Sequence, residues 1–191
     1  MEFKTESYID ESFEELSLIE GRLEDKEFSN CNFKYCDFTK TMFDNCFFDE
    51  CTFEQCELNM IGITKSTFRK CSVTECRALG IDWEKVSTSF MIDFKYSILN
   101  HCVFWKVDLQ KCSFVSCQMK ETMFEHSLLQ KVKLVDNDFE GASFKNCDLS
   151  GADFSQSQNY FIDLTQNKAK KAIFSMPEAI ALLQSFDIVI Q

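Results

Sequence analysis

The chain of 191 residues has few of the residues on which most catalytic and ligand sites are built. It has two histidines, His101 and His126, which are far apart and outside the core pattern, so a cysteine–histidine nucleophile pair is not expected. Its five glycines form no G-x-G or G-K-(S/T) arrangement, which leaves no loop to cradle a phosphate. No apolar run is long enough to cross a membrane.

Positive charge is also scarce. The chain has 20 lysines and arginines against 31 acids, a net charge of −11, so it repels phosphate and direct nucleic-acid binding is not expected. The charge is uneven, because residues 1–27 carry −7 and residues 134–167 carry −5, whereas residues 65–133 carry +4. The basic cluster in the middle (Lys65, Arg69, Lys70 and Arg77) is interpreted as a solvated face, with a binding stripe as the alternative.

What the sequence does have is a large residue, mostly apolar, at every fifth position. This five-residue periodicity is unbroken from Phe3 to Val73, and it resumes one residue out of phase from Phe94 to Phe154. A period of five matches neither an α-helix, with 3.6 residues per turn, nor a flat strand, with two. It predicts a solenoid whose backbone turns a corner every five residues.

A second inward position lies two residues before each large one. Besides cysteine, the occupants of this small slot between residues 41 and 152 are mostly serine, threonine and alanine, and the surrounding positions are polar. The spacing is not that of a zinc site, and buried free thiols fit a reducing cytoplasm, so we expect a cytoplasmic protein without metal or disulfides. All eleven cysteines occupy the slot: Cys31, Cys36, Cys46, Cys51, Cys56, Cys71, Cys76, Cys102, Cys112, Cys117 and Cys147.

This pattern resembles the pentapeptide-repeat family, whose consensus block is A-(D/N)-L-x-x. The closest blocks are residues 147–151, C-D-L-S-G, and residues 152–156, A-D-F-S-Q. The resemblance extends over roughly residues 26–165. It implies an all-β solenoid, a right-handed quadrilateral β-helix with four blocks per coil and coils about 4.8 Å apart.

Three segments are expected. Residues 1–27 should form an irregular N-terminal capping coil, because Glu6 and Glu11 occupy the small slot and a buried glutamate is costly. Residues 28–165 should form the β-helix, with a one-residue phase slip within 74–93. The slip is interpreted as a bulge or short turn at 80–89, and both a harmless kink and a functional loop stay open.

Residues 166–191 should form a C-terminal cap helix and dimerisation segment. Ser175 and Glu178 have capping-box spacing around Pro177, the only proline, which predicts a short α-helix. The ending resembles that of Qnr-type quinolone-resistance members of the family, with Asp187 where a glycine is common; this implies end-to-end homodimerisation. Capping within a monomer is the alternative. The expected interface is Phe174, Ile180, Leu183, Phe186, Ile188 and Ile190.

Two functions follow, neither of them enzymatic, because a core filled by phenylalanine and cysteine leaves no pocket for a substrate or cofactor. The resemblance implies a DNA-mimic-like dimer that binds a type II topoisomerase (DNA gyrase or topoisomerase IV) and protects it from quinolones. The alternative is an interaction scaffold with an unrelated partner, suggested by outward aromatic residues such as Tyr35, Phe47 and Tyr96. The candidate partner-binding residues are Asp44, Glu54, Asp136, Asp138, Asp148 and Trp105.

Overall fold

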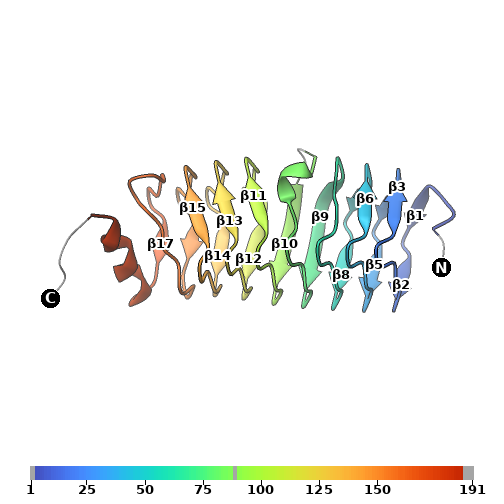
Figure 1. Ribbon diagram of the computed structural model, residues 1–191, viewed down its shortest axis with the longest axis horizontal. Coiled ribbons are helices and arrows are strands. Elements are labelled where there is room, and N and C mark those ends of the chain that lie inside the picture. The colour runs from blue at the N-terminus through green and yellow to red at the C-terminus, as the bar shows by residue number, and fades with distance from the viewer. Residues whose placement is uncertain (1–2, 88–89, 187–191) are drawn as a thin grey trace.

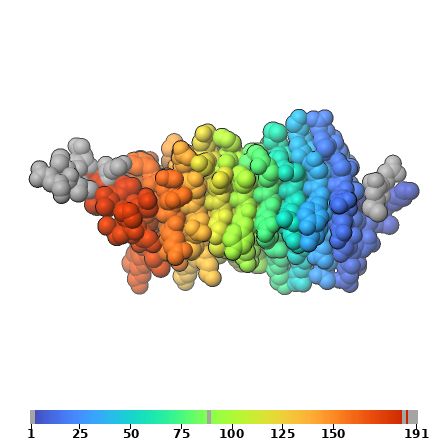
Figure 2. Space-filling view, turned by 90° about the horizontal axis from the view of Figure 1, so that it is seen from below, coloured from blue at the N-terminus to red at the C-terminus, as the bar shows by residue number. Residues whose placement is uncertain are grey.

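The chain forms a straight rod of stacked coils, with the N-terminus at one end and a short helix at the other (Figure 1). The structure is a computed structural model that describes residues 3–87 and 90–186. Figure 2 shows the coils as closely packed bands across the rod. The predicted β-helix is confirmed.

Short strands, most of three residues, make up the coils. The strands are β1 (Ser7–Ile9), β2 (Ser12–Glu14), β3 (Arg22–Glu24), β4 (Glu27–Ser29), β5 (Asn32–Lys34), β6 (Met42–Asp44), β7 (Phe47–Asp49), β8 (Thr52–Glu54), β9 (Thr67–Thr74), β10 (Phe90–Lys95), β11 (Val103–Trp105), β12 (Ser113–Val115), β13 (Met123–Glu125), β14 (Lys133–Val135), β15 (Ser143–Lys145), β16 (Asp153–Phe154) and β17 (Ile173–Phe174). Two 3₁₀ helices, η1 (Trp83–Lys85) and η2 (Glu178–Phe186), complete the described elements.

Each strand pairs in parallel with the strand one coil away, which divides the rod into four faces. The first face holds β1, β4 and β7, and the second holds β2, β5 and β8, followed by β12, β14, β16 and β17. β9 turns the corner between them, since Phe68 pairs with Phe48 on the first face and Val73 with Phe53 on the second. The third face is joined by isolated bridges, and the fourth holds β3 with β6 and β11 with β13 and β15.

The large residues fill the rod as columns of stacked rings. On the first face the ring centroids of Phe28 and Phe48 lie 5.0 Å apart, and those of Phe48 and Phe68 lie 4.9 Å apart. Rings of neighbouring faces meet edge to face, as Phe48 and Phe53 do. These rings belong to one continuous core, and the offset and edge geometries are the ones that aromatic pairs favour.

The small slot has a chemical role as well as a size limit. Its side chain hydrogen-bonds to the backbone carbonyl of the large residue one coil earlier: Cys36 Sγ donates to Phe13 O at 3.3 Å and Ser66 Oγ to Phe43 O at 2.8 Å. Asn137 does the same through Nδ2 to Phe114 O at 2.9 Å. Slot residues with a donor therefore also join successive coils, whereas Ile61, Val107 and Ala152 fill the slot by packing alone.

The first coil is regular, so the prediction of an irregular cap over 1–27 is wrong. Ser7 pairs with Glu27 and Ser12 with Asn32, in the same register as the later coils. Because no described coil precedes it, the slot side chain of Glu6 is exposed and has no burial cost. The ring of Phe3 covers the open end against those of Tyr8, Phe13 and Phe28.

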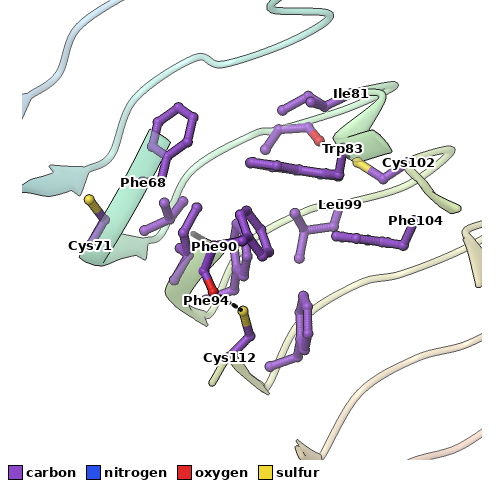
Figure 3. Packing of buried hydrophobic residues seen from close by; sticks show 14 of the residues in the cluster. Phe68, Cys71, Ile81, Trp83, Phe90, Phe94, Leu99, Cys102, Phe104 and Cys112 are labelled. Atoms are coloured by element: carbon purple, nitrogen blue, oxygen red, sulfur yellow. Dashed lines mark hydrogen bonds between the residues drawn. The ribbon is translucent and has the colours of Figure 1, made fainter. Parts of the chain in front are cut away.

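The phase slip is taken up where β9 meets β10. Phe90 pairs with Phe68 but Ile92 pairs with Cys71, so the register shifts between them. η1 precedes this bulge, and its Trp83 turns inward, 2% exposed, with its ring stacked on that of Phe104 (Figure 3).

The C-terminal helix differs from the prediction in type. η2 is a 3₁₀ helix, and Ser175 does not form the predicted capping box. Its hydroxyl instead accepts a hydrogen bond from Gln156 N at 3.1 Å, which fastens the segment to the coil before it. The side chain that would have capped an α-helix is therefore already used.

Substitution of Asn137 tests the role of the slot. Asn137→Ala removes both the acceptor of Cys117 N, at 2.8 Å, and the donor to Phe114 O. Two buried backbone groups would lose partners, so the free energy of unfolding should fall by about 2–4 kcal/mol. Gln118→Ala, on the exposed surface one coil away, should change it by less than about 0.5 kcal/mol. Urea unfolding measures both, and equal losses would contradict the assignment.

Candidate interaction surface

Charged side chains on the rod pair with residues one coil away. Lys70 Nζ lies 2.6 Å from Glu50 Oε1, and Lys34 Nζ lies 3.0 Å from Glu54 Oε1. Each pair is twenty residues apart, because equivalent positions of successive coils are neighbours across parallel strands. An acid and a base twenty residues apart can therefore form an ion pair between coils. The prediction of the partner surface did not use this spacing.

Three of the predicted partner-binding acids are neutralised in this way. Asp44 pairs with Arg22 at 2.8 Å, Glu54 pairs with Lys34, and Asp138 lies 3.2 Å from Lys120 Nζ. Partial burial would raise the pKa of Asp138, but hydrogen bonds from Asn159 and Lys120 outweigh it and lower that pKa. These carboxylates are poor substitutes for free phosphate charges.

The other predicted acids form hydrogen bonds. Asp136 accepts one from Ser116 Oγ at 2.8 Å, and Asp148 accepts one from Ser150 N at 3.1 Å. The bonds from Ser150 hold the pKa of Asp148 below its usual value. Asp44, Glu54 and Asp138 lie on the fourth, second and third faces, so the structure does not bring the predicted set together.

Among the described residues, six acids at the N-terminal end of the rod, five on the first coil and Glu27 beside them on the second, have no ion-pair partner. Within the described ranges, no lysine or arginine lies at ion-pair distance from these six exposed carboxylates. Asp10, for example, accepts only an amide bond from Asn30, at 2.6 Å. We call these six the first-coil acids: Glu6, Asp10, Glu11, Glu14, Glu15 and Glu27.

Three exposed lysines without an ion pair are aligned in the opposite half of the rod. Lys111, Lys131 and Lys171 lie along the edge between the first and second faces, and all three are exposed. In the part of the chain that the structure describes, none of them lies within ion-pair distance of a carboxylate. By contrast, Arg69 and Lys70 of the basic middle are paired with Asp49 and Glu50.

The outward aromatic residues do not form one patch. Tyr35 and Tyr96 are 50% and 62% exposed on the edge between the second and third faces, but they are separated by two coils. Trp105 lies on the fourth face, half-buried, with Lys106 Nζ 3.9 Å from its ring centroid. Arg69 lies over the ring of Phe47 in the same way, at 5.8 Å.

The C-terminal end exposes apolar side chains. Ile180, Leu183 and Phe186 of η2 are 42%, 39% and 49% exposed. Phe174 is partly buried and stacks on Phe154 at 5.1 Å, so it belongs to the last coil of the core. Of the predicted dimer interface, Ile188 and Ile190 lie outside the described residues.

The thiols are arranged for packing and hydrogen bonding. All eleven are free and buried. Burial raises the pKa of Cys102 to about 11 and that of Cys112 to about 12, so both stay protonated and able to donate near neutral pH. Within residues 3–87 and 90–186, no three histidines, cysteines or acids are placed to hold a metal ion.

One recess lies beside the turn of η1. It has a volume of about 330 Å³ and is lined by Trp83, Val86, Phe90, Lys106 and Asp108, among others. Ser87 also lines it, but neither a cysteine nor a histidine does. None of the described helices is long and apolar enough to cross a membrane.

The comparison with protein families identifies the repeat. The model for pentapeptide repeats matches in eight copies, over residues 13–59 and 117–156. The chain is a pentapeptide-repeat protein. No curated protein sequence matches it significantly.

Solved structures share the fold of this pentapeptide-repeat protein over most of its length. A trypsin-treated variant of QnrB1, a plasmid-mediated fluoroquinolone resistance protein, matches with a TM-score of 0.68 at 18% identity and 97% coverage of each chain. A second trypsin-treated variant gives 0.55 at 21% identity and the same coverage. HetL, a pentapeptide-repeat protein of heterocyst differentiation regulation from the cyanobacterium Nostoc sp., gives 0.52 at 14% identity, covering 87% of this chain and 84% of HetL.

Thiol labelling tests the arrangement of the cysteines. The native protein should react slowly with a thiol reagent near neutral pH, because all eleven thiols are buried and out of reach of the reagent. After denaturation all eleven should react. Rapid labelling of several cysteines in the native protein would contradict this packing.

Proposed function

We propose that this pentapeptide-repeat protein is a noncatalytic, cytoplasmic protein that binds a type II topoisomerase, DNA gyrase or topoisomerase IV, as a DNA mimic. The supporting observation is the likeness of its fold to a plasmid-mediated fluoroquinolone resistance protein over 97% of both chains. Such binding would compete with DNA and protect the enzyme from quinolones.

The charge distribution supports a specific contact. A mimic of the duplex must present carboxylates whose charge is not already neutralised within the rod. Glu11, Glu14 and Glu15 meet this condition, whereas Glu54 and Asp44 are paired with Lys34 and Arg22. We therefore assign the main contact to the first-coil acids, with Asp136 and Asp148 as additional charges.

The second candidate is an interaction scaffold with an unrelated partner. The exposed rings of Tyr35 and Tyr96 favour it, since exposed aromatic residues are common at protein contacts. The fold likeness to HetL is consistent with a regulatory scaffold. This candidate predicts binding that salt and the first-coil acids do not affect.

A supercoiling assay with purified gyrase separates the two candidates. The protein should inhibit supercoiling or relieve quinolone inhibition, and the triple variant Glu11→Gln, Glu14→Gln, Glu15→Gln should weaken the effect by about tenfold, because uncompensated charge drives the encounter. Glu54→Gln, which removes a carboxylate already paired with Lys34, is the matched control and should have little effect. If the wild-type protein has no effect in low salt, the scaffold candidate remains.

We also propose that η2 joins two copies end to end. Ile180, Leu183 and Phe186 present apolar surface at the tip of the rod, where each solenoid needs a cover. Packing of this surface against its counterpart in a second chain would remove the apolar side chains of both copies from solvent.

Disruption of this contact should produce monomers. The double variant Leu183→Asp, Phe186→Asp places charges in the apolar surface, so light scattering at about 0.5 M salt, where surface charges are screened, should report half the wild-type mass. Lys145→Asp, on the fourth face, should leave the dimer intact. A wild-type protein that is monomeric at micromolar concentration in this buffer would refute the contact.

A further inference from the structure

The edge between the first and second faces has a charge pattern that reverses along the rod. This edge carries the fifth residue of one block in every coil, and successive residues are stacked, as the bonds from Asn30 N to Asp49 O and from Lys131 N to Ser150 O show. We call it the polar edge. In order from the N-terminal end it consists of Asp10, Asn30, Glu50, Lys70, Met91, Lys111, Lys131, Gly151 and Lys171.

The two halves of the polar edge have opposite charge. Asp10 and Glu50 stand in the first half, where the positive charge of Lys70 is neutralised by Glu50 at 2.6 Å. Lys111, Lys131 and Lys171 stand in the second half, without ion-pair partners among the described residues. Lys168 and Lys170, exposed on the adjoining first face, add to the positive end.

In a second copy that lies antiparallel to the first, the residues of the polar edge run in the opposite order, so residues of opposite charge face each other. We propose that two copies of this chain associate side by side and antiparallel along the polar edge, related by a two-fold axis. In this arrangement Asp10 faces Lys171 of the second copy, Glu50 faces Lys131, and Asn30 faces Gly151. A two-fold contact is self-complementary, so each opposite-charge pair occurs twice.

The middle of the polar edge fits the same axis. Met91 is the central residue and is partly buried opposite Lys70 in its own chain, so the two copies of Met91 meet on the axis. Lys70 faces Lys111 of the second copy, a like-charge contact that Glu50 offsets only in part, because its carboxylate would lie between Lys70 of its own chain and Lys131 of the second copy. On the second face, the two copies of Asp93 also lie near the axis, where the hydrogen bond from Ser113 Oγ at 2.5 Å holds each carboxylate to its own chain but leaves a like-charge contact.

The shape of the rod allows the contact to continue along the whole edge. The coils are in single file without a bend (Figure 1), so a constant spacing of about 4.8 Å keeps two antiparallel copies in register. The positions beside the polar edge include short side chains, such as Ser12 and Ser72 on the second face and Ser29 and Ser150 on the first. Longer side chains, such as Arg69 and Lys133, flank the edge as well and would lie beside the contact.

Side-by-side pairing would regulate the proposed function, and this consequence rests on that proposal. Asp10 and its neighbours Glu11 and Glu14 belong to the first-coil acids, which we assign to the topoisomerase contact. A second copy that covers them would compete with the enzyme. The pairing would be favoured at low salt and high protein concentration, and would release the acidic surface on dilution.

The test uses the full chain with Leu183→Asp and Phe186→Asp, so that apolar end contacts cannot contribute. Sedimentation velocity at about 0.05 M salt should show a dimer, and its dissociation constant should rise at least about tenfold at about 0.5 M salt. Adding Lys131→Glu and Lys171→Glu should abolish the dimer at low salt. The matched control, Lys65→Glu with Lys145→Glu, changes the same net charge away from the polar edge and should retain it.

Exchange of the acidic and basic charges of the polar edge between two chains is the decisive part of the experiment. In the same background, a chain with Asp10→Lys and Glu50→Lys should be monomeric alone, and so should the chain with Lys131→Glu and Lys171→Glu. Mixed together, the two chains should form a heterodimer, because only then do opposite charges meet along the edge. Monomers at every salt concentration, or a mixture that fails to associate, would overturn the proposal.

The same experiment also tests whether another ligand, rather than a second copy, binds the lysines in the second half of the polar edge. If the protein stays monomeric but a short DNA duplex or a poly-glutamate peptide binds it and the Lys131→Glu, Lys171→Glu variant does not, the proposed second copy is wrong. Pairing is measured without any topoisomerase. A dimer that dissociates as described, together with a negative supercoiling assay, would therefore refute the proposed function and leave the pairing intact.

Discussion

Where the small slot holds a thiol, hydroxyl or amide, its hydrogen bond to the preceding coil is the interaction on which the rest of the rod depends. Cys36, Ser66 and Asn137 all donate to the carbonyl of the large residue one coil earlier. That carbonyl would otherwise be a buried acceptor with little compensation. The bond therefore joins coil to coil from inside, while the stacked rings fill the space between the four walls.

This bond also explains the unusual use of cysteine. A thiol is small enough for the slot, tolerates an apolar surrounding and donates when protonated. Burial raises the pKa of Cys112 to about 12, so the thiol keeps its proton and its role as donor. Because these thiols hold the rod together, the surface is left to carry the interactions with partners.

Stacking determines which surface charges remain available. At several places where an acid and a base lie on neighbouring coils, as Glu50 and Lys70 do, the rod neutralises its own charge. The first-coil acids and the lysines of the polar edge escape this neutralisation. The net charge of −11 is thus a poor guide to the electrostatics, because part of the charge is already paired between neighbouring coils.

The five-residue periodicity was sufficient to predict the solenoid, its inward residues and the place of the phase slip, since each follows from periodicity alone. The first coil was mispredicted because the slot was taken to be buried everywhere, whereas Glu6 faces solvent. The helix type was missed because Ser175 bonds to Gln156, a long-range contact that local spacing does not reveal. The predicted acids Asp44 and Glu54 depended on outward position only, and their partners one coil away were not considered.

Carboxylate footprinting of the protein bound to gyrase tests the central functional claim most directly. A water-soluble carbodiimide modifies exposed carboxylates, and mass spectrometry reports the extent at each one. The account predicts that Glu11, Glu14 and Glu15 become protected on binding, whereas Glu50, paired with Lys70, changes little. Unchanged modification of the first coil in the presence of saturating enzyme would contradict the claim that these acids take the place of DNA phosphates.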